Sequence, residues 1–296
     1  MRTLIALAVL PMLFDVTPGS AVSKLKEKKN CTFTIEQRVE GEIGGAGRQL
    51  EARMNGVWVK PDVLHVKFGD RAEMARRGTN ALFKEGDQWK TAAEHEKDRQ
   101  SQQQQGGQQG GQQQQQSRAA QIVLDRLAAV LAPADEIARR GGGLAKQKTT
   151  EKVNGTDCTV FMGPLSKDAA NAFAKECCEV IPAANGGGGG GGRMPGGGGP
   201  RAPGPGGGGG GGGGSFTPAT PKEASGGAKL LISTTDELPM QLVLLVTFKI
   251  EVRTDNGGSE QREVSVTRTL TLADFEKAKL ELDEYPRKKL GIVEKP

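Results

Sequence analysis

Residues 242–253, LVLLVTFKIEVR, carry the strongest structural signal in this chain. Every second residue from Leu242 to Val252 is apolar, while the residues between them change from apolar (Val243, Leu245) to polar. A period of two predicts a β-strand, here with one face buried throughout and the other covered only at its start. The letters DNGG at 255–258 predict a tight turn. The chain should therefore return as the second strand of a β-hairpin.

The return strand contains one inward-facing charge. Apolar residues from Val264 to Leu272 alternate with outward-facing Ser and Thr, but Arg268 falls on the inward side. The interpretation we favour is a side chain that extends to the rim of the sheet, because an unpaired buried charge is costly. The alternative is a buried charge with a function.

Shorter alternating segments upstream predict an antiparallel meander. In Cys31–Glu40 the apolar residues again occupy every second position, and His65 falls on the polar side of its strand. Further strands are expected at 50–59, 64–68, 73–76, 81–84, 148–153 and 157–162. Short turns between most of these segments favour antiparallel pairing of neighbours.

Two helices are expected between the strand groups. The first begins at Ser117 and carries an apolar stripe as far as Leu131, and Pro133 ends or restarts it. The second begins at Ser166, with Ala170, Phe173 and Cys177 on one side. The fold class is therefore α+β: a strongly curved antiparallel β-sheet with two or three helices packed on its concave side.

Two low-complexity segments interrupt this pattern. Residues 98–117 are rich in Gln and Gly, and residues 185–226 are rich in Gly and Pro. Such composition is typical of disordered, solvated chain. Because loop closure costs little more for a long loop than for a short one, both fit as insertions in a single domain spanning 22–296.

The N-terminus is typical of an export signal. Arg2 precedes an apolar run from Leu4 to Phe14, and small residues at Gly19 and Ala21 favour cleavage after Ala21. The predicted signal peptide is 1–21, the predicted location is the periplasm or the cell exterior, and no integral membrane segment remains after cleavage. The rival interpretation is a buried N-terminal strand.

Export implies an oxidising compartment, where thiols pair. Cys177 and Cys178 are adjacent and do not easily bond to each other, so the candidate disulfide joins Cys158 to Cys177 or to Cys178. For Cys31, the alternative is a reduced thiol buried on the apolar face of its strand.

Patterns for catalysis, metals and nucleic acids are missing from the sequence. His95 begins a zinc-protease-like motif, but Arg99 stands where the second His must be. The glycine runs lack the Lys-Ser/Thr ending of a phosphate loop, and the net charge of +5 is spread along the chain. We predict no catalytic residues, no metal site, no cofactor and no nucleic-acid partner, so the protein is not expected to be an enzyme.

The order of these elements resembles the periplasmic lipoprotein-carrier superfamily (LolA/LolB/LppX-like proteins). The similarity lies in GVWVKPD at 56–62 followed by LHVKF at 64–68, in the hairpin at 72–90, and in Leu238-Pro239 before the long C-terminal strands. The resemblance implies a half-barrel sheet under a helical lid. The family pattern does not include the low-complexity insertions.

Such a half-barrel implies a cavity that holds a lipid, an acyl chain or another apolar small molecule by burial alone. Residues proposed to line it are Leu242, Leu244, Val246, Phe248 and Ile250. The interpretation we favour for these five side chains is that they simply fill a core. Three functional hypotheses remain. The first is an exported cell-envelope protein that binds an apolar ligand, and the second is an exported structural or interaction module that contacts an envelope protein partner. The third and least favoured is an envelope hydrolase.

Overall fold

A computed structural model describes residues 16–41, 50–69, 72–105, 127–178, 219–253 and 259–292. Eleven strands form one antiparallel sheet in the order β6-β5-β4-β3-β2-β1-β11-β10-β9-β8-β7. The strands are β1 (Asn30–Glu40), β2 (Leu50–Val59), β3 (Val63–Phe68), β4 (Ala72–Arg77), β5 (Asn80–Glu85), β6 (Gln88–Thr91), β7 (Ala145–Val153), β8 (Thr156–Pro164), β9 (Lys222–Ser233), β10 (Pro239–Arg253) and β11 (Ser259–Ala273).

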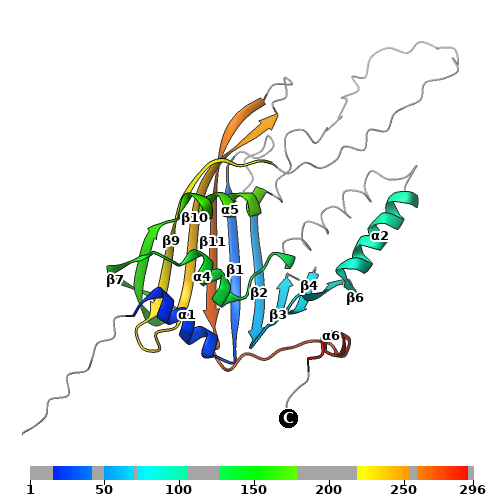
Figure 1. The fold of residues 1–296 in the computed structure, drawn as a ribbon, viewed down its shortest axis with the longest axis horizontal. Coiled ribbons are helices and arrows are strands. Elements are labelled where there is room, and N and C mark those ends of the chain that lie inside the picture. Colours follow the sequence, from blue (N-terminus) through cyan, green and yellow to red (C-terminus); the bar gives the residue numbers. More distant parts are fainter. Residues whose placement is uncertain are drawn as a thin grey trace, which may run out of the picture.

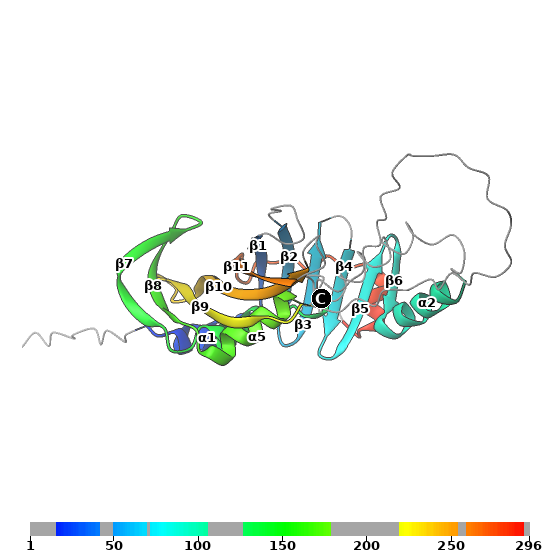
Figure 2. The same ribbon diagram turned by 90° about the horizontal axis from the view of Figure 1, so that it is seen from above.

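Five helices accompany the sheet within these residues: α1 (Pro18–Glu27), α2 (Ala92–Gln105), α4 (Pro133–Arg140), α5 (Lys167–Cys178) and α6 (Glu284–Lys289). Figure 1 shows α1, α4 and α5 lying across the longer strands, and Figure 2 shows the curvature of the open sheet above them. Helix α2 lies beside β5 and β6 at the other end of the sheet. The α+β class with a curved half-barrel sheet, expected from the sequence, is confirmed.

The topology explains why helical chain covers the concave face. Strands β6 and β7 follow one another among the strands of the chain, yet they form the two opposite edges of the sheet. The connection between them must therefore run from one edge to the other, and its described parts are helix α2 and residues 127–144, which include helix α4. Pro133 begins helix α4, at an N1/N2 position that suits proline. The first ten residues of the helix expected from Ser117 lie outside the described residues.

The main core lies between the concave face and helices α1, α4 and α5. Leu25, Ile137 and Phe173 come from the three helices, and all are almost fully buried against strands of the sheet. The long hairpin pairs Leu242 with Leu270 and Val246 with Val266, so the inward side chains expected from the alternating pattern do share one face. Helix α5 also follows the prediction, since its Ala170, Phe173 and Cys177 side is buried.

Two expectations about the chain between elements need correction. Helix α2 extends to Gln105, so the insertion expected at 98–117 begins inside a helix; the rest of that segment lies outside the described residues. Strand β9 was not expected and begins at Lys222, inside the insertion expected at 185–226, because β10 supplies a partner for its backbone. Gly226 allows this close pairing, since a Cβ there would overlap the backbone of Leu245.

The predicted signal-peptide boundary falls within helix α1. Thr17 and Ser20 form a capping box at the start of this helix, and Ala21 is completely buried in the core. Cleavage after Ala21 would therefore remove the cap and one core residue. No helix among the described residues combines the length and the apolar character needed to cross a bilayer.

Candidate ligand-binding cavity

All five side chains proposed to line a cavity lie on the concave face of β10 and are almost completely buried. Of these five, Leu242 and Leu244 border a cavity among the described residues. Val246, Phe248 and Ile250 lie farther along the strand and belong to the packed core. The five predicted residues therefore divide into two that line the cavity and three that fill the core.

The cavity has a volume of about 60 Å³ and lies between the middle of the sheet and the connection that crosses it. Its lining is mostly aliphatic on the sheet side and includes charged side chains on the helix side: Ile35, Gln37, Ala52, Met54, Ala129, Val130, Leu131, Glu136, Glu176, Leu242, Leu244, Arg268 and Leu270. Pockets for drug-sized ligands measure roughly 300–1,000 Å³. In this conformation the cavity therefore has room for a few water molecules and not for an acyl chain.

The outer wall of the cavity is the short segment before helix α4. Ala129, Val130 and Leu131 cover the cavity, and Arg76 of β4 donates hydrogen bonds to the carbonyl oxygens of Ala128 (3.4 Å) and Val130 (2.9 Å). Burial lowers the pKa of Arg76 from its ordinary value, and the nearby Asp135 partly offsets this. Arg76 thus connects the segment that forms the outer wall to strand β4.

Arg268 forms the polar end of the cavity. The β1–β11 register places it opposite Gln37, and the β10–β11 register places it opposite Leu244. The Arg268 guanidinium donates to the Gln37 side-chain oxygen from Nε (3.1 Å) and from Nη2 (2.9 Å). Its side chain is 20% exposed. The rim position favoured from the sequence is therefore wrong: the charge is held inside the concave face, where polar partners compensate for its burial.

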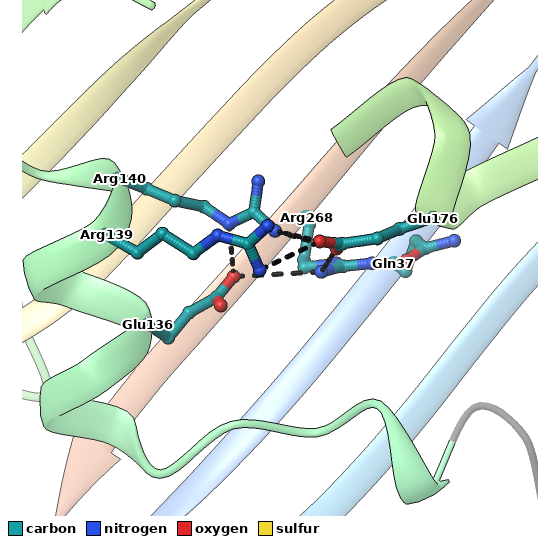
Figure 3. Close-up of polar contacts among 6 residues, drawn as sticks. All are labelled: Gln37, Glu136, Arg139, Arg140, Glu176 and Arg268. Carbon is teal, nitrogen blue, oxygen red and sulfur yellow. Dashed lines mark hydrogen bonds and ion pairs between the residues drawn. The ribbon is translucent and has the colours of Figure 1, made fainter. Parts of the chain in front are cut away.

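The partners of Arg268 come from both covering helices (Figure 3). Its Nη1 lies 3.4 Å from a carboxylate oxygen of Glu176 on α5 and 3.7 Å from one of Glu136 on α4. Arg140, on α4 and with a side chain only 1% exposed, makes closer contacts: 2.8 Å to Glu136 and 2.7 Å to Glu176. Arg139 adds a contact of 3.1 Å to Glu176. This charge cluster, formed by Gln37, Glu136, Arg139, Arg140, Glu176 and Arg268, joins α4, α5 and the sheet.

Phe173 supports the two inner guanidinium groups. The guanidinium carbon of Arg268 lies 4.5 Å from the centre of its ring, and that of Arg140 lies 4.8 Å from it. Contacts of this kind are favourable cation–π interactions. The phenyl ring is completely buried, so it limits the positions that both arginines can adopt.

His65 is also placed differently from the sequence expectation. It is 3% exposed, and its Nε2 lies 3.1 Å from Glu73. The outer face of this strand is covered because Ala75, its neighbour on β4, packs with Leu282 and Leu290 of the C-terminal segment. Burial lowers the His65 pKa from its ordinary value, and the hydrogen bond that His65 donates to the Glu73 carboxylate only partly opposes this.

The candidate disulfide is not formed in the described part of the chain, where all four cysteines are buried. Cys177 and Cys178 belong to the main core on the concave side. Cys158 packs with Val160 in a separate cluster, and strand alternation directs these side chains away from Phe161, which faces the main core. The proposed partners thus lie on opposite faces of the sheet. Burial raises the pKa of Cys31 and of Cys178 to about 12.

Among the described residues no group of three or more His, Cys, Asp or Glu side chains could hold a metal ion. The cavity instead combines aliphatic walls with a polar end formed by the Arg268 guanidinium and the carboxylates of Glu136 and Glu176. Such a site can bury a small apolar group against its sheet side.

Comparisons with protein-family models and with curated proteins found no match. Among solved structures, LprF from Mycobacterium bovis aligns with a TM-score of 0.35 and 8% identity, over 90% of this chain and 94% of that chain. A LolA superfamily protein from Nitrosomonas europaea aligns with a TM-score of 0.28 and 9% identity, over 91% of this chain and 99% of that chain. A DUF1329 family protein from Desulfovibrio piger aligns with a TM-score of 0.25 and 8% identity, over 90% and 92%. The likeness to these structures is distant, and it concerns the fold alone.

Proposed function

We propose that this protein is an exported cell-envelope protein that binds a lipid, an acyl chain or another apolar small molecule between the concave face and the covering helices, without catalysing a reaction. The observation that carries the proposal is the cavity at this interface, whose sheet side is formed by aliphatic residues such as Ile35, Met54 and Leu244. Each methylene group buried in such a place contributes about 0.8 kcal/mol. Burial alone can therefore hold a chain of modest length.

Binding requires that the cavity enlarge, because about 60 Å³ does not accommodate such a ligand. The segment at 127–132 is the part of the wall best suited to move. The two Arg76 hydrogen bonds that hold its carbonyl groups involve donors and acceptors that water can satisfy. Losing each one costs about 1 kcal/mol, which burial of a few methylene groups offsets.

The first experiment is native mass spectrometry, with solvent extraction, of the protein purified gently from its expression host. We expect co-purifying acyl species that are lost when the cavity is filled by Ala52→Trp. Ala52 lines the cavity on β2, whereas Ala273, near the end of β11, does not. Ala273→Trp is therefore the matched control. A ligand-free mass for the native protein, together with no uptake of an apolar fluorescent dye, would refute the proposal.

A second candidate function is an interaction module with a filled core. The side chains of Val246, Phe248 and Ile250 are almost completely buried in the core, which favours this alternative. On the opposite face of the sheet, Met162 and Leu245 are about half exposed, as contact residues for a partner would be. The ligand-free outcome of the experiment above would favour this function over the first.

A further inference from the structure

The charged side chains at the polar end of the cavity balance one another. Two carboxylates, of Glu136 and Glu176, line the cavity. Two guanidinium groups, of Arg140 and Arg268, each contact both of these carboxylates. Arg139 also contacts Glu176, but its side chain is 50% exposed, so water screens its charge. The polar end therefore presents no net charge to a ligand.

A charged head group is unfavourable at such an end. Moving an ion out of water carries a penalty that only a well-placed partner of opposite charge offsets. Here both carboxylates are already engaged, because Arg140 lies 2.8 Å from Glu136 and 2.7 Å from Glu176. An anion would have to displace a carboxylate from an arginine, and a cation would have to displace a guanidinium group. The part of a ligand that enters the cavity is therefore expected to be uncharged.

One hydrogen-bond acceptor at the polar end remains open. Glu136 contacts Arg140 at 2.8 Å and Arg268 at 3.7 Å through the same oxygen, Oε1. Within the part of the chain that the structure describes, its second oxygen, Oε2, has no hydrogen-bond partner, and Figure 3 shows this oxygen on the side of the carboxylate away from the arginines. An ionised carboxylate accepts hydrogen bonds and cannot donate one. A ligand group that pairs with Oε2 must therefore be a donor.

The acceptor belongs to a cavity with an apolar wall. Leu242 and Leu244 of β10 and Ile35 of β1 line the same cavity as Glu136. The Glu136 side chain is only 10% exposed and is held by Arg140, so little of its freedom remains to be lost on binding. A hydroxyl group is an uncharged donor, and on an aliphatic chain it would satisfy both parts of this lining.

We propose that the cavity binds an uncharged aliphatic alcohol, whose hydroxyl group donates a hydrogen bond to Oε2 of Glu136 while its chain lies along the concave face of β10. The inference rests on the proposed function and specifies its ligand class. Fatty acids and alkylamines fall outside this class, because both are ions at neutral pH.

The test measures the binding of four decyl ligands at pH 7, below their aggregation concentrations, by displacement of an apolar dye and by calorimetry. Decan-1-ol carries the hydroxyl donor, 1-methoxydecane has the oxygen without the donor, and decanoate and decylammonium carry the two charges. The native protein should bind decan-1-ol about tenfold or more tightly than each of the other three. Hydrogen bonds to charged groups are the stronger ones, and burial of an unpaired ion is costly.

Glu136→Gln tests the acceptor. When the Gln oxygen accepts the bond from Arg140, its amide nitrogen stands in place of Oε2 and donates instead of accepting. The preference for decan-1-ol over 1-methoxydecane should then disappear, since the oxygen of either ligand can accept. The matched control is Glu51→Gln, because Glu51 precedes the cavity residue Ala52 on β2 but its side chain is 60% exposed. This control should leave all four affinities unchanged.

Arg268→Gln tests the charge balance, and it keeps the proposal testable if Glu136→Gln does not fold. Both carboxylates keep Arg140 as a partner in this variant, but the polar end gains a net negative charge. The affinity for decylammonium should increase by about tenfold, and the preference for decan-1-ol over 1-methoxydecane should remain. An unchanged affinity for decylammonium contradicts the charge balance.

The outcomes separate the two proposals. Equal binding of all four ligands by the native protein, or tighter binding of either ion than of decan-1-ol, overturns the inference and leaves the proposed function standing. A preference for decan-1-ol that survives in Glu136→Gln also overturns it, because the hydroxyl group would then bind elsewhere. Binding of none of the four ligands overturns the proposed function itself.

Discussion

Replacing Arg140 by Met tests whether the charge cluster holds the helical layer on the sheet. The side chain of Arg140 is 1% exposed and contacts Glu136 at 2.8 Å and Glu176 at 2.7 Å. Methionine is unbranched and of comparable length, so it retains packing against Phe173 while removing the charge and its hydrogen bonds. Arg139→Met is the control, because Arg139 is the adjacent residue on the same helix and contacts the same Glu176, but its side chain is 50% exposed.

The expected loss of unfolding free energy differs between the two variants. Removing one partner of a buried ion pair costs about 3–5 kcal/mol, because it leaves a buried charge without compensation. Here Glu136 and Glu176 keep contacts with Arg268, at 3.7 and 3.4 Å, so part of the compensation remains. We therefore expect about 3 kcal/mol for Arg140→Met. For the exposed pair of Arg139 we expect less than about 1 kcal/mol.

Urea denaturation followed by tryptophan fluorescence measures both values, since Trp58 is buried in the main core and reports its exposure on unfolding. The slope of the unfolding free energy against urea concentration should be the same for the native protein and both variants. The midpoints of unfolding then compare their stabilities directly. If the two variants lie within about 0.5 kcal/mol of each other, the cluster makes no special contribution, and the reasoning from burial is refuted.

Three further outcomes are expected. Gly56→Ala should lower the unfolding free energy by about 1–3 kcal/mol in urea titrations, because its Cβ would overlap the ring of Phe33; an unchanged stability would show that the ring moves aside readily. Burial lowers the pKa of His65 below 6.5, so the unfolded chain takes up the proton first and stability should fall as pH decreases through and below this value. His65→Gln should flatten that dependence in thermal melts measured at several pH values, and an unaltered slope would mean that other groups cause it. Because burial raises the pKa of Cys31 and Cys178 to about 12, the native protein should react slowly with iodoacetamide at pH 8, whereas unreduced, denatured protein should gain four adducts by mass spectrometry; fewer adducts would reveal a disulfide.

The strands of the long hairpin were predictable because their pattern is local. Alternation decides which side chains share a face, and Leu242, Leu244 and Arg268 do lie together on the concave side as the spacing requires. Helix α5 was predictable for the same reason, since its apolar residues recur with the helical period.

The surroundings of those side chains could not be predicted from local patterns. Arg268 was expected at the rim because a buried guanidinium without a partner is costly, and no partner is visible in the neighbouring sequence. Its partners Glu136 and Glu176 are distant in the sequence, and they reach it only because the edge-to-edge connection and α5 cross the concave face. His65 was expected on the solvent-exposed face of its strand, but the C-terminal segment covers the outer face beside it.

The amino-acid sequence by itself determined the α+β class, the faces of the principal strands and the single charge on the inward side, because each follows from the spacing of neighbouring residues along one element. Only the tertiary structure decided that the inward apolar residues divide between a core and a small cavity, and that Cys158 faces away from Cys177. It also decided that Arg268 is held by the Gln37 amide and by carboxylates that it shares with Arg140. These features depend on which distant segments meet across the sheet. The packing of one element against another determines these features, and the spacing of residues within a single element does not encode that packing.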